Sequence, residues 1–254
     1  MKIGFFDSGI GGITVLNEAL KILPDEEYIY YADTHNAPYG IKKKSVVRDY
    51  VFNAVEFIVR KGIKALVIAC NTATSITIRD LRKKYSFPVI GMEPAVKPAL
   101  SHADNKKILV LATPLTIKEN KYRNLVSKLD ADNIVVSMAL PELVEYAEKG
   151  IFKNGKIISF LKKKFQDYNL DEYGTIVLGC THFLFYKRCF EEIIPENIDI
   201  IDGNYGTVLH LKNTLIKNEL INNMYYGQKI IFYFSGKFDN KRGERYLNYY
   251  NNTL

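Results

Sequence analysis

The stretch LVIACNT at residues 66–72 decides the fold class. It is an apolar run of strand type that leads through a small residue to a cysteine and then to residues that can open a helix. The stretch IVLGCTH at 176–182 repeats this order further along the chain. A strand that runs directly into a helix is typical of the parallel sheets of α/β proteins. The sequence therefore predicts an α/β fold in which Cys70 and Cys180 hold equivalent positions.

Short runs rich in Ile, Val, Phe and Tyr recur along the chain and alternate with longer stretches of helical periodicity. We expect strands at 2–6, 28–31, 65–69, 88–91, 107–111, 134–138, 175–178, 198–201 and 229–234, and helices at 42–60, 75–85, 116–128 and 156–165. Strands with helices on both sides are expected to be parallel and buried on both faces. The alternation predicts a doubly wound architecture with right-handed crossovers.

Nine strands are many for one compact sheet, which favours two lobes. One break in the pattern lies at 93–102, where Pro94 and Pro98 interrupt the periodicity, and a second lies at 202–204. The strand at 229–234 can return to the first lobe. We therefore expect a first α/β lobe made of residues 1–95 and 206–254, and a second α/β lobe made of residues 96–205.

The composition narrows the class of protein. Of 254 residues, 47% are hydrophobic and 25% are charged, which excludes disordered and low-complexity chains. The three cysteines form no C-x-x-C pair, so we expect neither a disulfide framework nor a zinc site. An acid at Asp7 interrupts the apolar start, and no apolar run approaches the ~18 residues of a membrane helix. We expect a cytoplasmic protein without membrane contact.

The net charge of +7 raises the possibility of nucleic-acid binding. The basic residues, however, come as short scattered runs at 42–44, 82–84, 106–107 and 162–164. These runs lie on or beside expected helices, and no recognisable nucleic-acid-binding module accompanies them. We therefore expect no specific nucleic-acid partner.

The two cysteines are candidates for acid–base chemistry. In parallel sheets the ligand crevice lies at the carboxyl ends of the strands, where helix N-termini attract anions and favour thiolates. The alternative is that each Cys is a small buried hydrophobe, as we expect for Cys189. Because Cys70 and Cys180 occupy equivalent positions, the functional interpretation is favoured for that pair.

The first expected strand leads into DSGIGG at 7–12. Its two alternating glycines suggest a dinucleotide loop, but Thr14 replaces the third glycine, and the preceding acid would repel a pyrophosphate. Asp7 is better explained as a carboxylate that serves a base or an ammonium group. The alternative, that Asp7 caps the following helix, remains open.

Five motifs together carry a resemblance to a known family. They are DSGIGG at 7–12, PYG at 38–40, ACNTAT at 69–74, EPAVKPA at 93–99 and LGCTHF at 178–183. In this order they resemble the glutamate racemases of the cofactor-independent aspartate/glutamate racemase superfamily. The resemblance covers most of the chain. It implies two similar doubly wound parallel-sheet lobes with the active site between them, no pyridoxal phosphate or other cofactor, no metal, and a homodimer.

The resemblance also implies a two-base reaction in which one Cys removes the α-proton of glutamate and the other delivers a proton to the opposite face. Cys70 and Cys180 would be this pair, with Asp7 assisting Cys70 and His182 assisting Cys180. Glu145 matches an acid of the family pattern. The expected substrate contacts are Asp7, Ser8, Tyr39, Gly40, Asn71, Thr72, Thr181 and His182.

The implied function is interconversion of L- and D-glutamate, which supplies D-glutamate for peptidoglycan. Two alternatives stay open. The first is a racemase of aspartate or another small acid in the same superfamily, and the second is a diverged binding protein without catalysis. Exchange of the α-proton in buffer without cofactor would separate a racemase from a binding protein.

Overall fold

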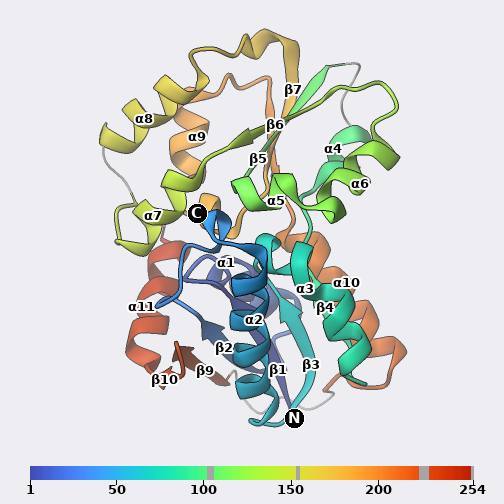
Figure 1. Ribbon diagram of the computed structural model, residues 1–254. Coiled ribbons are helices and arrows are strands. Elements are labelled where there is room, and N and C mark those ends of the chain that lie inside the picture. The colour runs from blue at the N-terminus through green and yellow to red at the C-terminus, as the bar shows by residue number, and fades with distance from the viewer. Residues whose placement is uncertain (102–105, 153–154, 223–228, 253–254) are drawn as a thin grey trace.

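The computed structural model describes residues 1–101, 106–152, 155–222 and 229–252. The chain forms two α/β lobes, each with its own sheet, and one lobe lies above the other in Figure 1. The strand order is β10-β9-β2-β1-β3-β4 in the lower lobe and β6-β5-β7-β8 in the upper lobe. The expected α/β class with two lobes is therefore confirmed.

The lower lobe contains the first and last parts of the described chain. Its strands are β1 (Lys2–Asp7), β2 (Glu27–Ala32), β3 (Ile63–Ile68), β4 (Val89–Gly91), β9 (Lys229–Phe234) and β10 (Lys237–Phe238). Its helices are α1 (Ile13–Ile22), α2 (Lys44–Val59), α3 (Asn71–Lys84), α10 (Asn204–Lys217) and α11 (Asn240–Asn251), with a short 3-10 helix, η1 (Tyr39–Ile41). Apart from the antiparallel β9–β10 pair, the paired strands are parallel.

The lower sheet is buried on both faces because neighbouring residues of each strand point to opposite sides. Phe5 packs in the cluster that includes residues of α1, α10 and α11. Phe6 packs in a second cluster that includes residues of α2 and α3. The sheet is thus wound on both faces, as the sequence predicts.

The upper lobe is built around β5 (Lys107–Ala112) and β7 (Tyr173–Leu178), which pair in parallel. The other strands are β6 (Val135–Ala139) and β8 (Asp199–Asp202). The helices are α4 (Val96–Ser101), α5 (Pro114–Lys118), α6 (Asn120–Leu129), α7 (Pro141–Glu148), α8 (Gly155–Phe165) and α9 (Lys187–Ile193), with 3-10 helices η2 (Leu170–Glu172) and η3 (Thr181–Tyr186). The strand pairs β1–β3 and β5–β7 correspond, and in each pair one of the two cysteines follows the second strand by two residues.

The nine expected strands are all present, with ends that differ by at most two residues from the predicted ones. The helix expected at 116–128 is instead two helices, α5 and α6, which meet at Glu119. The helix expected at 75–85 begins earlier, at Asn71, directly after Cys70. The break expected at 93–102 contains α4, and its residue 102 lies outside the described residues. Among the described residues, no helix is long and apolar enough to cross a membrane.

Candidate active site

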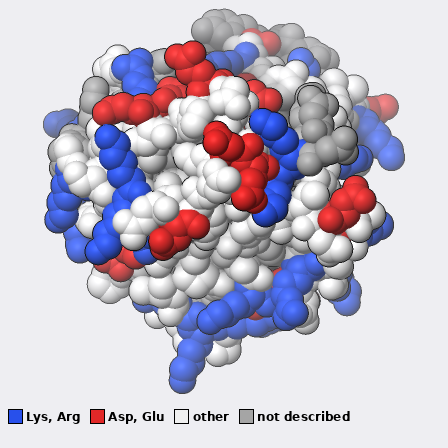
Figure 2. All heavy atoms as spheres, turned by 90° about the horizontal axis from the view of Figure 1, so that it is seen from above, with Lys and Arg blue, Asp and Glu red and all other residues white. Residues whose placement is uncertain are grey.

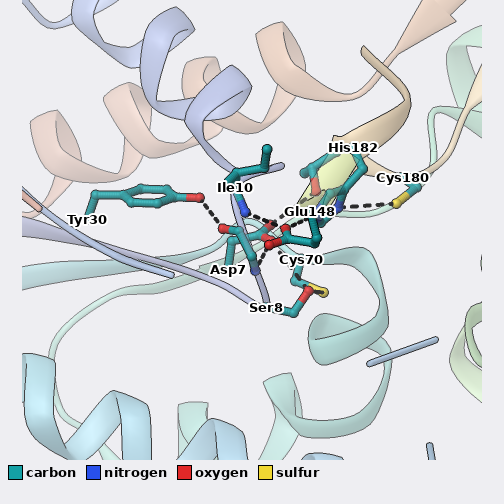
Figure 3. A network of polar contacts seen from close by, with 10 residues as sticks. Asp7, Ser8, Ile10, Tyr30, Cys70, Glu148, Cys180 and His182 are labelled. Atoms are coloured by element: carbon teal, nitrogen blue, oxygen red, sulfur yellow. Dashed lines mark hydrogen bonds and ion pairs between the residues drawn. The ribbon is translucent and has the colours of Figure 1, made fainter. Parts of the chain in front are cut away.

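The carboxyl ends of the two sheets face each other, and their loops meet there. Asp7 is the last residue of β1, whereas Cys70 and Cys180 each follow their strand by two residues. Thr181 of the upper lobe donates a hydrogen bond from its hydroxyl to Asp7 Oδ2 of the lower lobe, at 3.1 Å. A side chain on Gly11 would collide with Thr181, so glycine permits this close approach. Figure 3 shows the resulting polar network.

Cys70 is linked to a carboxylate through a serine. Its thiol lies 3.5 Å from Ser8 Oγ, and that hydroxyl lies 3.4 Å from Asp7 Oδ1. Cys70 also caps α3, because its sulfur accepts the backbone N–H of Ala73 at 3.5 Å. The structure therefore joins three residues of the predicted site in one chain of polar contacts. Asp7 caps no helix, since Gly12 precedes α1.

Cys180 is linked to a different carboxylate through a histidine. Its sulfur lies 3.9 Å from His182 Nδ1, and His182 Nε2 lies 2.7 Å from Glu148 Oε1. The same Glu148 oxygen accepts the backbone N–H of Ile10 at 2.8 Å, which again joins the two lobes. Each thiol thus has its own polar chain that ends on a carboxylate (Figure 3).

The surroundings of Asp7 and Cys70 favour their protonated forms. Burial raises the pKa of Asp7 from 3.8 to about 6, although the charge of His182 and hydrogen bonds from Gly9 and Thr181 lower it. Burial and the negative charge of Asp7 raise the pKa of the Cys70 thiol to about 12. The Cys70 thiol therefore stays protonated unless the charge of a neighbouring group changes.

The surroundings of His182 also favour its protonated form, which for an imidazole is the charged form. Burial on its own would lower the pKa of this imidazole, but hydrogen bonds and negative charges from Cys180 and Glu148 raise it well above its usual value. His182 is 1% exposed, so the charge is compensated by its neighbours and not by water. A cation thus faces Cys180, whereas above pH 6 the ionised carboxylate of Asp7 lies behind Ser8 on the side of Cys70.

Hydroxyl and amide groups form a second part of the site. Thr72, Thr113 and Thr116 lie within 2.8 to 3.0 Å of one another through their hydroxyl oxygens. Thr72 belongs to the lower lobe, and the other two belong to the upper lobe. Beside them, both side-chain polar atoms of Asn71 are buried without a hydrogen-bond partner among the described residues. A buried amide of this kind is a ready partner for a polar ligand.

Tyr39 and Gly40 lie beside this hydroxyl cluster. The Tyr39 hydroxyl donates to Asp33 Oδ2 at 2.6 Å, and Asn36 Nδ2 donates to the same carboxylate at 3.0 Å. A side chain on Gly40 would collide with Thr113. The PYG turn is therefore held by Asp33 against the upper lobe.

One predicted catalytic residue lies elsewhere. The carboxylate of Glu145 is 3.8 Å from Lys149 on the surface of α7, with 45% of the Glu145 side chain exposed. Glu148, one turn later on α7, makes the contact with His182 instead. The structure therefore places Glu145 outside the polar network, and the motif match could not separate the two acids, because residues three apart on a helix lie close in direction and the sequence does not show which one faces the site.

The other predicted site residues are brought together by the two lobes. Sequence reasoning missed Glu148, Thr113 and Thr116. A signal exists for Thr113, which follows the apolar strand β5 much as Cys70 and Cys180 follow theirs, and Thr116 lies one turn later in α5. For Glu148 no comparable local signal exists.

Comparisons with known proteins agree with this geometry. The family model for Asp/Glu/Hydantoin racemases matches residues 13–208, more than three quarters of the chain. The chain belongs to this family. Within the Asp/Glu/Hydantoin racemases, the chain is 60% identical to the glutamate racemase of Halothermothrix orenii, over 97% of this chain and 98% of that protein. It is 56% identical to glutamate racemase 2 of Bacillus subtilis, over 87% of this chain and 84% of that protein.

Solved structures of the family share the fold. The chain is similar to a glutamate racemase isoform from Bacillus anthracis, with a TM-score of 0.84 and 31% identity over 93% of this chain and 89% of that one. It is also similar to the glutamate racemase of Francisella tularensis in complex with D-glutamate, with a TM-score of 0.82 and 28% identity over 97% of this chain and 93% of that one. An aspartate racemase from Picrophilus torridus, at 18% identity, shares the fold alone.

Proposed function

We propose that this protein is a glutamate racemase, which interconverts L- and D-glutamate by proton transfer at Cα without a cofactor. The observation that carries the proposal is the pair of thiols, each linked to its own carboxylate, on two lobes that meet at the carboxyl ends of their sheets. Such a pair can serve two faces of one small molecule. The alternatives of aspartate or another small acid as the substrate share this chemistry and differ only in the fit of the side chain.

The reaction needs one thiolate and one thiol. With L-glutamate, the Cys180 thiolate takes the α-proton, and the Cys70 thiol gives its proton to the opposite face, which leaves D-glutamate. The reverse reaction exchanges the two roles, so no proton is gained or lost overall. His182 stabilises the Cys180 thiolate as a cation, and the Ser8–Asp7 chain assists Cys70 when it must act as the base.

The remaining polar groups bind the substrate and stabilise the charge that develops at Cα. We assign this role to Tyr39, Gly40, Asn71, Thr72 and Thr181, which the sequence predicts, and to Thr113 and Thr116. Their hydroxyl and amide groups are buried, so a bound carboxylate would meet donors that water does not compete for. Closure of the lobes would exclude water from the carbanion.

Exchange of the α-proton tests the proposal. Incubated in D₂O without cofactor, the protein should incorporate deuterium at Cα of L-glutamate and produce D-glutamate. Cys70→Ala and Cys180→Ala should each abolish racemisation, because one thiol cannot serve both faces. Full racemisation by either variant would exclude the two-thiol mechanism, and absence of exchange in the unmodified protein would favour a binding protein.

The proposal extends to the organisation and place of the enzyme. We propose lobe boundaries at 1–95 with 206–254 and at 96–205, which the division of the strands between the two sheets supports. We also propose that the enzyme is a cytoplasmic homodimer that supplies D-glutamate for peptidoglycan. Light scattering in solution tests the dimer.

A further inference from the structure

A cavity of about 630 Å³ opens beside the site, on the side of Glu148. It is separate in its lining from the two thiols, and its volume is in the range of small-molecule sites. Its walls come from the end of β2 and the residues after it, from α7, from the β9–β10 turn and from α11. The lining includes Asp33, His35, Glu148, Ser235, Lys237 and Arg242.

One wall carries two cations without a carboxylate partner. Neither Lys237 nor Arg242 forms an ion pair with any residue in the described ranges. The guanidinium of Arg242 lies 4.3 Å from the centre of the Phe234 ring, so its plane is held by an aromatic contact. A half-buried guanidinium that is held in place and lacks an anion is a binding group for a carboxylate.

The turn that presents Lys237 is strained. Ser235 and Gly236 have positive φ angles of 46° and 83°, as a two-residue hairpin requires, but serine adopts this region only at a cost. Three contacts fix the turn to the end of β2. Ser235 N donates to Ala32 O at 2.8 Å, its hydroxyl donates to Asp33 Oδ1 at 3.3 Å, and His35 N donates to that hydroxyl at 2.9 Å. Strained residues held in this way cluster at ligand sites.

The lining of the cavity also carries two acids, Glu148 and Asp33. Glu148 has 14% of its side chain exposed, and its Oε1 is already engaged by His182 and Ile10. The carboxylate of Asp33 is buried, and within the described part of the chain its donors are all neutral, from Asn36, Tyr39 and Ser235. The cavity lining thus offers two cations and two carboxylates. This pattern complements a zwitterion with two carboxylates.

We propose that this cavity is a second, outer site for an acidic amino acid, whose carboxylates bind Lys237 and Arg242 and whose ammonium group faces Glu148. The inference rests on the proposed function only in taking glutamate as that amino acid. Because Glu148 also holds His182, an ammonium at the outer site competes for the same carboxylate. Occupancy of the outer site therefore slows proton transfer at Cys180, and L-glutamate inhibits its own conversion at high concentration.

Binding without turnover tests the outer site directly. The variant Cys70→Ser with Cys180→Ser holds glutamate without racemising it, and calorimetric titration with L-glutamate should give two equivalents per chain. Adding Lys237→Gln and Arg242→Gln should leave one. The control adds Arg48→Gln and Lys84→Gln, an Arg and a Lys that do not line this cavity, and should keep two equivalents.

The active enzyme gives a second readout. Lys237→Gln with Arg242→Gln should leave the rate at low L-glutamate unchanged and remove the inhibition at high L-glutamate. One equivalent in every variant overturns the outer site, as does a charge variant that raises KM without changing the number of equivalents, since the cavity is then only a passage. No bound glutamate in any variant overturns this inference together with the proposed function, whereas one equivalent leaves the proposed function intact.

Discussion

Cys70 and Cys180 are chemically alike, but the charges next to them differ. Cys70 has the carboxylate of Asp7 behind Ser8, and Cys180 has the imidazole of His182. We expect Asp7→Asn to lower kcat mainly with D-glutamate, and His182→Asn to lower it mainly with L-glutamate, because each assists the thiol that acts as base in that direction. General acid–base assistance is typically worth about 100-fold or more. The initial rates in the two directions measure the effect.

Equal losses in both directions would contradict this division of roles. Asp7 and His182 would then position substrate or lobes and would not each serve one thiol. Thr72→Ala provides a control, because its hydroxyl bonds to Thr113 and Thr116 and belongs to neither polar chain of the thiols. It should slow both directions by similar factors.

Ionisation of the buried Asp7 should also lower the free energy of unfolding at neutral pH. Its pKa of about 6 in the folded protein exceeds the ordinary 3.8, so the unfolded chain loses this proton first as pH rises. This loss of unfolding free energy is absent below pH 3.8, grows between pH 3.8 and pH 6, and is complete above pH 6. It amounts to about 3 kcal/mol. Asp7→Asn should therefore raise the free energy of unfolding at pH 7 by up to this amount, and the gain should vanish near pH 4.

Denaturant titrations of both proteins at several pH values measure this gain. A gain that does not change between pH 4 and pH 7 would show that ionisation of Asp7 is not its source. The predicted stabilised variant is a poor enzyme, as expected where an active-site charge is buried for function.

At the residue scale, the sequence showed the cysteines, Asp7 and His182 because strand ends carry a local signature. It could not distinguish Glu145 from Glu148. That choice depends on how α7 is rotated against η3 and on the backbone N–H of Ile10, which lies 138 residues away. Contacts of this range leave no trace in local periodicity.

At the scale of elements, the loop between β1 and α1 connects both polar chains. Tyr30 of β2 is fully buried, and its hydroxyl donates to Gly9 O at 2.7 Å, between Asp7 and the Ile10 N–H that holds Glu148 (Figure 3). We expect Tyr30→Phe to slow racemisation in both directions and to reduce the free energy of unfolding by about 1–2 kcal/mol, since Gly9 O loses its donor.

Tyr28→Phe is the matched control. Tyr28 is also fully buried on β2, but its hydroxyl donates at 2.6 Å to the carbonyl oxygen of Leu23, which lies in the loop after α1 and outside the polar network of the thiols. It should lose similar stability and keep its rate. A Tyr30→Phe enzyme with unchanged rates would show that this loop does not need the tyrosine.

The elements that the sequence missed depend on partners distant in the chain. The helix expected at 116–128 divides at Glu119, whose carboxylate lies 2.6 Å from Lys44 Nζ on α2 of the other lobe. The short strand β10 exists because the strained turn at Ser235 folds it back on β9. The long strands were predictable because runs of branched apolar residues fit a sheet that is buried on both faces.

At the scale of the whole molecule, the charge of +7 is dispersed. Figure 2 shows Lys and Arg interspersed with Asp and Glu over the upper and middle parts of the face seen from above, with a group of Lys and Arg along its lower edge. Lys44, Lys84, Lys107 and Lys164, one from each predicted basic run, all lie within 2.8 Å of a carboxylate. Paired charges release fewer counterions from DNA. We expect only weak binding to duplex DNA that disappears at physiological salt.

Filter binding at several salt concentrations measures this. Submicromolar, sequence-specific binding at physiological salt would contradict the expectation.

The two lobes themselves were predictable from the number of strands and from the breaks in periodicity. Their closeness was not, because it rests on Gly9 and Gly11, where any side chain would collide with Glu148 or Thr181 of the upper lobe.

Because the chain returns to the first sheet only near its end, this sheet cannot be completed until late in synthesis on the ribosome. β2 ends at Ala32, but its neighbour β9 starts only at Lys229. At about 5–20 residues per second, the ribosome needs roughly 10–40 s to make the stretch between them. During that time the upper lobe emerges, and β2 is a bare edge that other nascent chains can pair with. A ribosome stalled before residue 229 would therefore release a chain with a catalytic lobe still open to aggregation.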